Sequence, residues 1–185
     1  MTGVPLRTDR LVATPLAERD WPDFRALLLD PRVSATIGGV RPEAEVRGRF
    51  EADLRHWEEH GFGQWAWRMP DGAFAGRGGL RRYRIEGGEE VVELGYSVVA
   101  ERWGVGLATE IARTSLGFGF TQLGLDRIHA FVFEGNAASV RVLAKCGFEP
   151  VGPMTHGGHA CELYALTAQE YQAGGSLPGA GGSAV

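Results

Sequence analysis

The order of apolar periodicities after residue 60 limits the fold of this chain more than any other feature of its sequence. Three segments with strand-like composition, separated by turn signals, come first: residues 62–69, 74–84 and 89–99. Helical and strand-like segments then alternate: a helix over 105–123, a strand over 127–133, a helix over 136–145 and closing strands over 148–151 and 160–166. A run of strands followed by strand–helix alternation predicts an α/β (α+β) fold with a mixed, mostly antiparallel central sheet of about seven strands flanked by helices.

The segment before residue 62 adds a strand and two helices to this pattern. A short apolar segment predicts a first strand over 10–16, and apolar residues at helical spacing predict a helix over 19–29. Pro31 ends that helix, because proline disfavours the α region in the residue before it. A long polar helix then runs from Pro42 and ends at Gly61, a residue type common at helix C-termini.

The length and composition indicate one globular domain. The 185 residues are 44% hydrophobic and 23% charged, so we expect a single domain over residues 1–173. The segment 174–185 is rich in Gly, Ser, Ala and Pro, and we expect it to be a disordered tail.

Net charge and hydropathy argue against two classes of partner. A net charge of −4 gives no support for binding to nucleic acid or to an anionic membrane. The sequence has no apolar run of membrane-spanning length, and residues 1–10 lack the apolar core of a secretory signal. The two cysteines, Cys146 and Cys161, do not make a disulfide framework, so we expect a reduced, cytoplasmic setting.

The segment Trp103-Gly104-Val105-Gly106-Leu107-Ala108 joins a strand to a helix and carries the strongest chemical signal. No Ser, Thr, Asp or Asn lies between Arg102 and Ala108, so the helix begins without the usual side-chain cap. A helix start leaves backbone N–H groups unpaired and partly positive, and the glycines keep them accessible. The segment therefore suits a phosphate or pyrophosphate, but a Gly-rich turn whose amides face water is an equally good interpretation. It matches neither a Walker A loop nor a Rossmann Gly-x-Gly-x-x-Gly run.

Four segments carry a family resemblance through their order and spacing. They are Thr8-Asp9-Arg10-Leu11 with Asp30-Pro31-Arg32-Val33, then Glu93-Leu94-Gly95-Tyr96, then Arg102 to Thr109, and finally Asn136-Ala137-Ala138-Ser139 with Lys145-Cys146-Gly147-Phe148. Over about residues 6–166 the sequence resembles the GNAT superfamily of N-acetyltransferases. It is similar in particular to the Rim-type branch, which includes acetyltransferases of ribosomal-protein N-termini.

Two positions depart from the superfamily pattern. Trp103 stands where the loop usually opens with Gln or Arg, which the Rim-type branch tolerates. Leu143 stands where many members have a tyrosine that protonates the leaving thiolate, so a tyrosine acid from this helix is not expected.

The resemblance implies a GNAT-like fold and direct transfer of an acetyl group from acetyl-CoA to a primary amine in a ternary complex. A protein N-terminal α-amine is one implied acceptor. The alternatives are a small amine, such as an antibiotic, polyamine or amino acid, and a non-catalytic acyl-CoA-binding regulatory role. We expect a monomer or a homodimer. The residues implied to contact acetyl-CoA are Tyr96, Ser97, Val98, Val99, Arg102, Trp103, Gly104, Val105, Gly106, Leu107, Ala108, Thr109, Asn136 and Ser139.

Glu93 is the first candidate for the base that takes a proton from the attacking amine. It alternates against apolar neighbours on a strand that should be central, where a buried carboxylate is costly without a function or a partner. The alternative is an ion pair with Arg81, Arg82 or Arg84 on the neighbouring strand. Ser139 is the implied hydrogen-bond donor to the departing thiolate, or else a first-turn helix serine that serves its own backbone.

Two histidine-containing segments resemble metal sites only weakly. His56 and His60 match the His-x-x-Glu-His zinc pattern but lack a clear third ligand, whereas His156, His159 and Cys161 are merely close in sequence. We expect no metal at either place. His159 is instead an alternative base or a group that orients the acceptor.

Several other residues have a structural interpretation beside the functional one. Asn136 suits a plain helix N-cap, and Arg102 suits a solvated surface position. Trp65 and Trp67 share one face of a strand and are expected in the core. The acceptor side is expected to be built from three segments: residues 37–41, 57–65 and 154–160.

Overall fold

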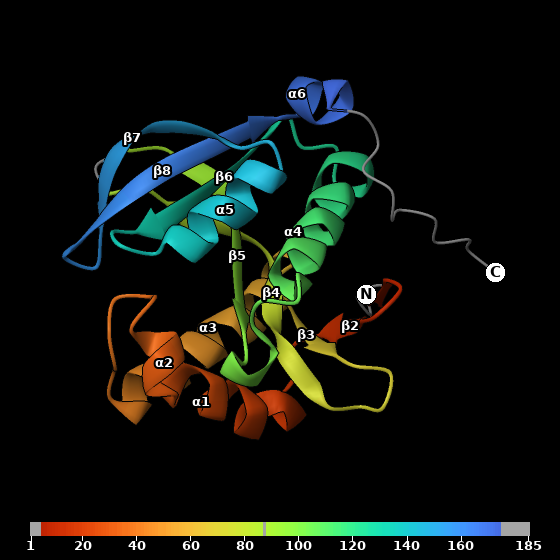
Figure 1. The fold of residues 1–185 in the computed structure, drawn as a ribbon, viewed down its shortest axis with the longest axis vertical. Helices are drawn as coiled ribbons and strands as arrows, with labels where there is room; N and C mark the ends of the chain where they lie inside the picture. The colour runs from red at the N-terminus through yellow and green to blue at the C-terminus, as the bar shows by residue number, and fades with distance from the viewer. Residues whose placement is uncertain (1–4, 87, 175–185) are drawn as a thin grey trace.

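A mixed sheet of eight strands forms the centre of this computed structural model, which describes residues 5–86 and 88–174 (Figure 1). The strands are β1 (Leu6–Arg7), β2 (Val12–Pro15), β3 (Gln64–Arg68), β4 (Phe74–Arg84), β5 (Glu90–Val98), β6 (Arg127–Phe133), β7 (Glu149–His156) and β8 (His159–Thr167). Their order is β1-β2-β3-β4-β5-β6-β8-β7, and neighbours are antiparallel except β5 and β6. The predicted fold class is confirmed, and the additional strand is β1, which pairs with β2 over two residues.

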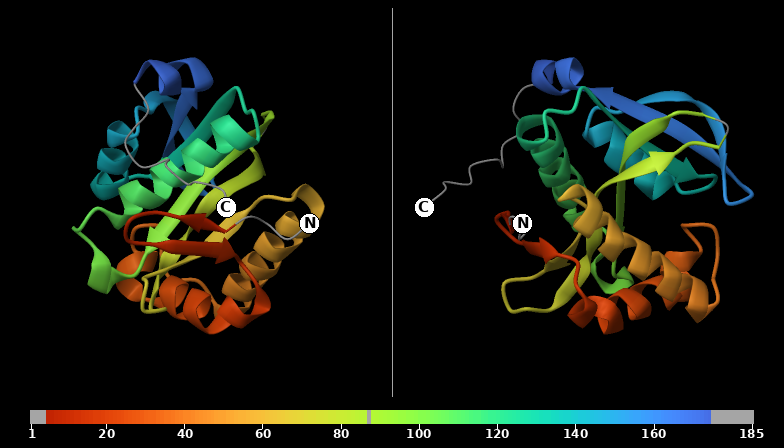
Figure 2. Two further views of the ribbon diagram at one scale, coloured as in Figure 1. Left: turned by 90° about the vertical axis from the view of Figure 1, so that its right-hand side faces the viewer. Right: turned by 180° about the vertical axis from the view of Figure 1, so that it is seen from behind.

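Helices pack against both faces of this sheet. They are α1 (Trp21–Leu29), α2 (Pro31–Ser34), α3 (Glu43–His60), α4 (Leu107–Gly117), α5 (Ala137–Lys145) and α6 (Ala168–Ala173). Two 3₁₀ turns, Glu18–Asp20 and Ala100–Arg102, and a π-helical turn after α4, Phe118–Gln122, complete the elements. In the two views of Figure 2, α1, α2 and α3 (red to orange) gather at one end of the molecule, whereas α5, β7 and β8 (blue) lie at the other.

Strand alternation produces two apolar clusters, one on each face of the sheet. Trp65 and Trp67 of β3 are fully buried and pack in a cluster with the apolar side chains of α4. Ala66 points the other way, because successive side chains of a strand face opposite sides, and it packs with Phe24 of α1 and Phe50 of α3. The prediction that both tryptophans belong to the core is therefore confirmed.

Two segments are more regular than the sequence predicted. α1 ends before Asp30-Pro31 as expected, but a further short helix, α2, starts there because the Asp30 carboxylate accepts a 2.9 Å hydrogen bond from the backbone N–H of Arg32 and proline suits the first helical position. β7 was expected to end near Val151 but continues to His156, paired with β8 after a register shift between Pro150 and Gly152. The acceptor segment 154–160 is therefore largely a β-hairpin, not an open loop.

The parallel strands β5 and β6 separate toward their carboxyl ends. They share a single pair of register partners, Glu93 and His129, whereas β4 and β5 remain paired from Gly76 to Arg84. Figure 1 shows the two strands pointing away from each other beyond that pair. This separation determines where the candidate site lies.

The expected tail falls, apart from Gly174, outside the described residues, and the single-domain expectation over 1–173 stays a prediction. Within the described ranges, no helix combines the length and apolar character needed to cross a bilayer.

Candidate active site

A cavity of about 530 Å³ lies where β5 and β6 separate. Its walls come from the carboxyl half of β5, the segment before α4, the end of β6 and α5. Glu93 lines it, and so do all residues predicted to contact acetyl-CoA except Val99 and Val105. Val99 instead packs toward α1 and α3, and Val105 is 58% exposed. The structure thus brings segments far apart in the sequence to one cavity.

The start of α4 lacks a side-chain cap, as the Gly-rich segment predicted, and its glycines have positive φ angles, which were not predicted from the sequence. Gly104 and Gly106 have φ angles of +79° and +86°, a region that other residues adopt only with strain. Gly106 is the N-cap, and no side chain of the described chain caps the helix there. The first amides of α4, from Leu107 to Thr109, therefore point their partial positive charge at the cavity end without competition from a side-chain oxygen.

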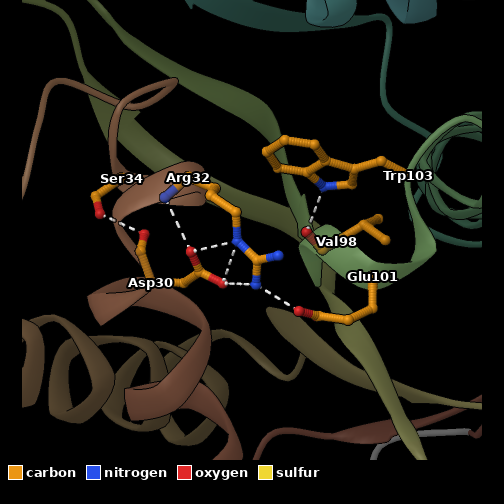
Figure 3. Close-up of polar contacts among 6 residues, drawn as sticks. All are labelled: Asp30, Arg32, Ser34, Val98, Glu101 and Trp103. Atoms are coloured by element: carbon orange, nitrogen blue, oxygen red, sulfur yellow. Dashed lines mark hydrogen bonds and ion pairs between the residues drawn. The ribbon is translucent and has the colours of Figure 1, made fainter.

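Trp103 anchors this segment to the end of β5. Its indole Nε1 donates a 2.8 Å hydrogen bond to the carbonyl oxygen of Val98 (Figure 3), although the residue as a whole is 46% exposed. The residue that departs from the usual loop pattern thus has a structural role, because it fixes where the loop leaves the strand.

An ion-pair network ties α2 to the other side of the same segment. The guanidinium of Arg32 bonds the carboxylates of Asp30 and Glu101, and the hydroxyl of Ser34 donates to the carbonyl of Asp30 (Figure 3). Glu101 belongs to the 3₁₀ turn between β5 and α4. The network therefore holds the α1–α2 corner against the segment that leads into the helix.

Several basic residues in or near the cavity were not identified from the sequence, among them Arg10, Arg141 and Lys145. Arg10 donates a 2.8 Å hydrogen bond to the carbonyl of Val105 and also pairs with Glu110 of α4. Arg141 and Lys145 of α5 line the cavity. Their spacing of four residues on a helix was a usable signal for the last two, whereas Arg10 comes from the distant β1–β2 turn and gave none.

The hydroxyl of Ser139 lies 2.8 Å from that of Tyr96, so α5 and β5 are bridged across the cavity wall. Tyr96 is largely enclosed, and burial raises the pKa of its phenol. Leu143 occupies the position where many superfamily members have a tyrosine. It is 1% exposed and packs in the core. Sequence reasoning placed only the backbone of Tyr96 in the site, and its side chain is a further candidate.

Asn136 acts as the N-cap of α5. Its Oδ1 accepts a 3.0 Å hydrogen bond from the backbone N–H of Ser139, and its Nδ2 donates to the carbonyl of Thr36 at 2.9 Å. The side chain thus caps the helix and joins it to the segment after α2. Asn136 lines the cavity as well, and its contact with acetyl-CoA stays a prediction.

Glu93 is 4% exposed and makes the ion pair that the sequence left as its alternative role. Its Oε2 accepts a 2.7 Å hydrogen bond from Nε of Arg81, the residue opposite it on β4. Its Oε1 lies 3.7 Å from where a Cβ on Gly95 would be, and so does Nε2 of Gln64. One oxygen is therefore held by Arg81, and the other lies beside Gly95 in the cavity wall.

The histidines have different surroundings. His156 lines the cavity, lies 2.6 Å from the hydroxyl of Tyr83, and has its pKa lowered to about 4 by burial and by nearby arginines. His159 is exposed at the hairpin turn and contacts Phe133. Both ring nitrogens of His56 are engaged, with the Phe62 carbonyl and the Arg82 amide. No cluster of potential metal ligands is found among residues 5–86 and 88–174.

The predicted acceptor segments meet only in part. A Cβ on Gly38 would lie 2.9 Å from Phe133 and 3.3 Å from His159, so the segment after α2 abuts the tip of the β7–β8 hairpin. Trp57, in contrast, donates a hydrogen bond from its indole Nε1 to the Gln64 carbonyl and packs against the core as a half-buried side chain.

Comparison with known sequences agrees with this geometry. The family model described as "Acetyltransferase (GNAT) domain" matches residues 10–149. The chain is 33% identical over 146 residues to the uncharacterized protein YkkB of Bacillus subtilis (strain 168), which covers 77% of this chain and 83% of that protein.

Solved structures share the fold. An acetyltransferase from Agrobacterium tumefaciens str. C58 is similar with a TM-score of 0.78 and 27% identity, over 90% of this chain and 95% of the other. The spermidine N-acetyltransferase of Vibrio cholerae, solved with CoA and spermine, has a TM-score of 0.68 over 88% and 98% of the two chains, and at 16% identity it concerns the fold alone. These similarities do not single out the Rim-type branch. Because the family model matches most of its residues, this chain belongs to the GNAT family of acetyltransferases.

Proposed function

We propose that this chain is an acetyl-CoA-dependent N-acetyltransferase that transfers the acetyl group directly to a primary amine in a ternary complex. The observation that carries the proposal is the continuity of one cavity from the uncapped start of α4 to the carboxylate of Glu93. A helix start that can bind an anion and a buried carboxylate, both lining one cavity, are what a CoA thioester and an amine require.

The residues present fit acetyl-CoA, which supplies the activated thioester when it is bound. The amides at the start of α4 suit the pyrophosphate, and Arg102, Arg141 and Lys145 add positive charge to the same cavity. Gly104 leaves space there, since a Cβ on it would meet no atom of the described chain within 4 Å. The carboxyl half of β5 would lie along the pantetheine arm.

Glu93 is the proposed base. The amine nitrogen bonds to the acetyl carbon, the carbon–sulfur bond breaks, and the proton lost by the amine goes to Glu93 directly or through water. The need for a base depends on the acceptor. An α-amine with a pKa of about 8 is partly neutral at pH 7, whereas a lysine amine with a pKa of about 10.4 is almost entirely protonated. A positioned base contributes roughly 10²–10⁴-fold.

The hydroxyl of Ser139 is the proposed hydrogen-bond donor to the departing thiolate. Tyr96 lies behind it at 2.8 Å and connects Ser139 to a second hydroxyl. Tyr96 on β5 and Ser139 on α5 thus provide the hydroxyl donor that Leu143 cannot provide. A backbone N–H of β5 that donates to the thioester carbonyl oxygen would stabilise the negative charge that develops there, in addition to the effects of Glu93 and Ser139.

Thiol release from acetyl-CoA, measured with a panel of amines, tests this function. The panel contains a peptide with a free N-terminus, small amines and amino acids, and calorimetry reports acetyl-CoA binding separately. Amine-dependent thiol release is expected. Binding of acetyl-CoA without release would indicate the non-catalytic acyl-CoA-binding role, and absence of binding would overturn the proposal. We further propose a cytoplasmic monomer or homodimer that acts without nucleic acid or membrane.

A further inference from the structure

A second cavity of about 230 Å³ adjoins the first, shares Arg49 and His156 with it, and is strongly basic. Arg41, Arg49 and Arg81 line it with a single carboxylate, that of Glu45. Arg49 lines the main cavity too, so the two cavities meet at its side chain. Arg81, which bonds Glu93, lines this second cavity, whereas none of the described residues from 102 to 117 does, so the basic cavity adjoins the proposed base and not the start of α4.

Most arginines in this region already have partners. Arg81 bonds Glu93 at 2.7 Å, Arg41 donates to the carbonyl of Ile37 at 3.0 Å, and Arg77 bonds the amide oxygen of Gln64 at 3.1 Å. Arg77 also lies 3.7 Å from the carboxylate of Asp53.

Arg49 has no such partner. Among the described residues it makes neither a hydrogen bond nor an ion pair, and its Nε is fully buried without an acceptor. Burial, together with the positive charges of Arg77 and Arg81, lowers the pKa of Arg49, although Asp53 and Glu93 act against this. Arg49 as a whole is half-buried, but a cation whose Nε is closed to water without an acceptor is costly unless an anion accompanies it.

We propose that the amine acceptor also carries an anionic group, a carboxylate or a phosphate, and that Arg49 binds this group while the amine reaches Glu93. The inference rests on the proposed function and narrows its substrate class. Arg41 and Arg81 add positive charge beside Arg49, and the planar guanidinium of arginine suits either anion. A polycation such as a polyamine would place a further positive charge beside three arginines, with Glu45 as the one carboxylate among the described residues that line this cavity.

The neighbouring wall is aromatic and uncharged. The ring of His156 is tilted against that of Phe131, with 4.4 Å between the ring centroids, and its centroid lies 5.4 Å from that of Tyr83. With its pKa near 4, His156 is neutral at pH 7 and adds no charge to the basic cavity. A small acceptor therefore meets arginines on one side and flat apolar surface on the other.

Matched acceptors test the charge requirement by thiol release. Each amino acid is compared with its carboxamide, phosphoethanolamine is compared with ethanolamine, and spermidine serves as the polycation. The anionic member should have kcat/KM at least about tenfold higher, from one charge-assisted contact, even though the carboxamide has the more easily deprotonated amine. The two pairs separate carboxylate from phosphate. Equal or better turnover of the neutral members, or a preference for spermidine, would overturn the inference and leave the acetyltransferase function standing.

Variants of two arginines on α3 assign the effect to one side chain. Arg49→Gln should reduce the preference for the anionic acceptor by about tenfold while the KM for acetyl-CoA is unchanged, and Arg49→Lys should retain part of it. Arg55→Gln, on an exposed position of the same helix, should leave the preference intact. Because the preference is a ratio within one preparation, partial misfolding does not affect it. An unchanged ratio in Arg49→Gln contradicts the assignment.

A binding measurement separates this inference from the proposed function. Calorimetry with CoA present compares the affinity of the chain for an N-acetyl amino acid with its affinity for the carboxamide of the same N-acetyl amino acid. Both compounds resemble the product, so no turnover is needed. Tighter binding of the acid to the unmodified chain, lost in Arg49→Gln, supports the anion site even if no amine is acetylated. Equal binding of the two compounds opposes it.

Discussion

Glu93 and Arg81 are direct cross-strand partners on β5 and β4, joined by a 2.7 Å hydrogen bond from Nε of Arg81 to Oε2 of Glu93. The bond leaves Oε1 of Glu93 beside Gly95, at the wall of the cavity. The ion pair and the proposed proton transfer therefore use different oxygens of one carboxylate. The structural and functional interpretations of Glu93 are compatible for this reason.

Replacing Glu93 by Gln should lower kcat by roughly 10²–10⁴-fold, because the amide accepts no proton. The amide oxygen can still accept the Arg81 hydrogen bond, so acetyl-CoA affinity should change little. Steady-state kinetics across pH and calorimetry measure both. Glu90→Gln is the control. Glu90 lies on β5 like Glu93, but its carboxylate is exposed and pairs with Arg82 of β4. Unchanged turnover at every pH would remove Glu93 as the base.

Replacing Gly106 by Val should weaken acetyl-CoA binding by about tenfold or more, because a β-branched residue at φ +86° costs ~1–3 kcal/mol and displaces the first amides of α4. Gly61→Val is the matched control: Gly61 also has a positive φ, +72°, but ends α3 away from the cavity. It should lower the melting temperature and leave acetyl-CoA affinity unchanged. Equal affinity in both variants would mean that the phosphate assignment is wrong.

Ser139→Ala should lower kcat by about tenfold, the effect of one lost hydrogen bond to a charged leaving group. Tyr96→Phe should act in the same direction, since the phenol is bonded to Ser139. If the two hydroxyls act as a unit, the double variant should be no slower than Ser139→Ala alone. Rates of the three variants at saturating acetyl-CoA measure this coupling, and strictly additive losses would show that the residues act separately.

The parts of the site that the sequence predicted are those set by local chain chemistry. The residues between Arg102 and Ala108 predicted a helix start without a side-chain cap, and the structure has one. The positive φ angles of Gly104 and Gly106 were not predicted. Strand alternation placed Trp65 and Trp67 on one buried face and Glu93 opposite an arginine. The choice of Arg81 among three arginines needed the exact register, which alternation alone does not supply.

The parts that escaped prediction depend on contacts between distant segments. Arg10 reaches the carbonyl of Val105, and Tyr96 reaches Ser139, through the packing of separate elements. Arg49 is one of several arginines in a polar helix, so the sequence did not distinguish it. Its proposed role depends on the arginines of the strand that lies beside α3 and on the absence of an acceptor for its Nε in the described chain.

Replacing His156 by Gln should flatten the loss of stability on acidification. Burial, and then the charges of Arg81, Arg49 and Arg41, lower the pKa of folded His156 from 6.5 to about 4. Between those values the unfolded chain binds a proton that the folded chain does not, so the free energy of unfolding falls as pH falls through this window and levels off below it. Urea unfolding from pH 7 to pH 4 should show the stability difference between the original chain and the variant narrowing. A difference that stays constant would show that folding does not depress the pKa of this histidine.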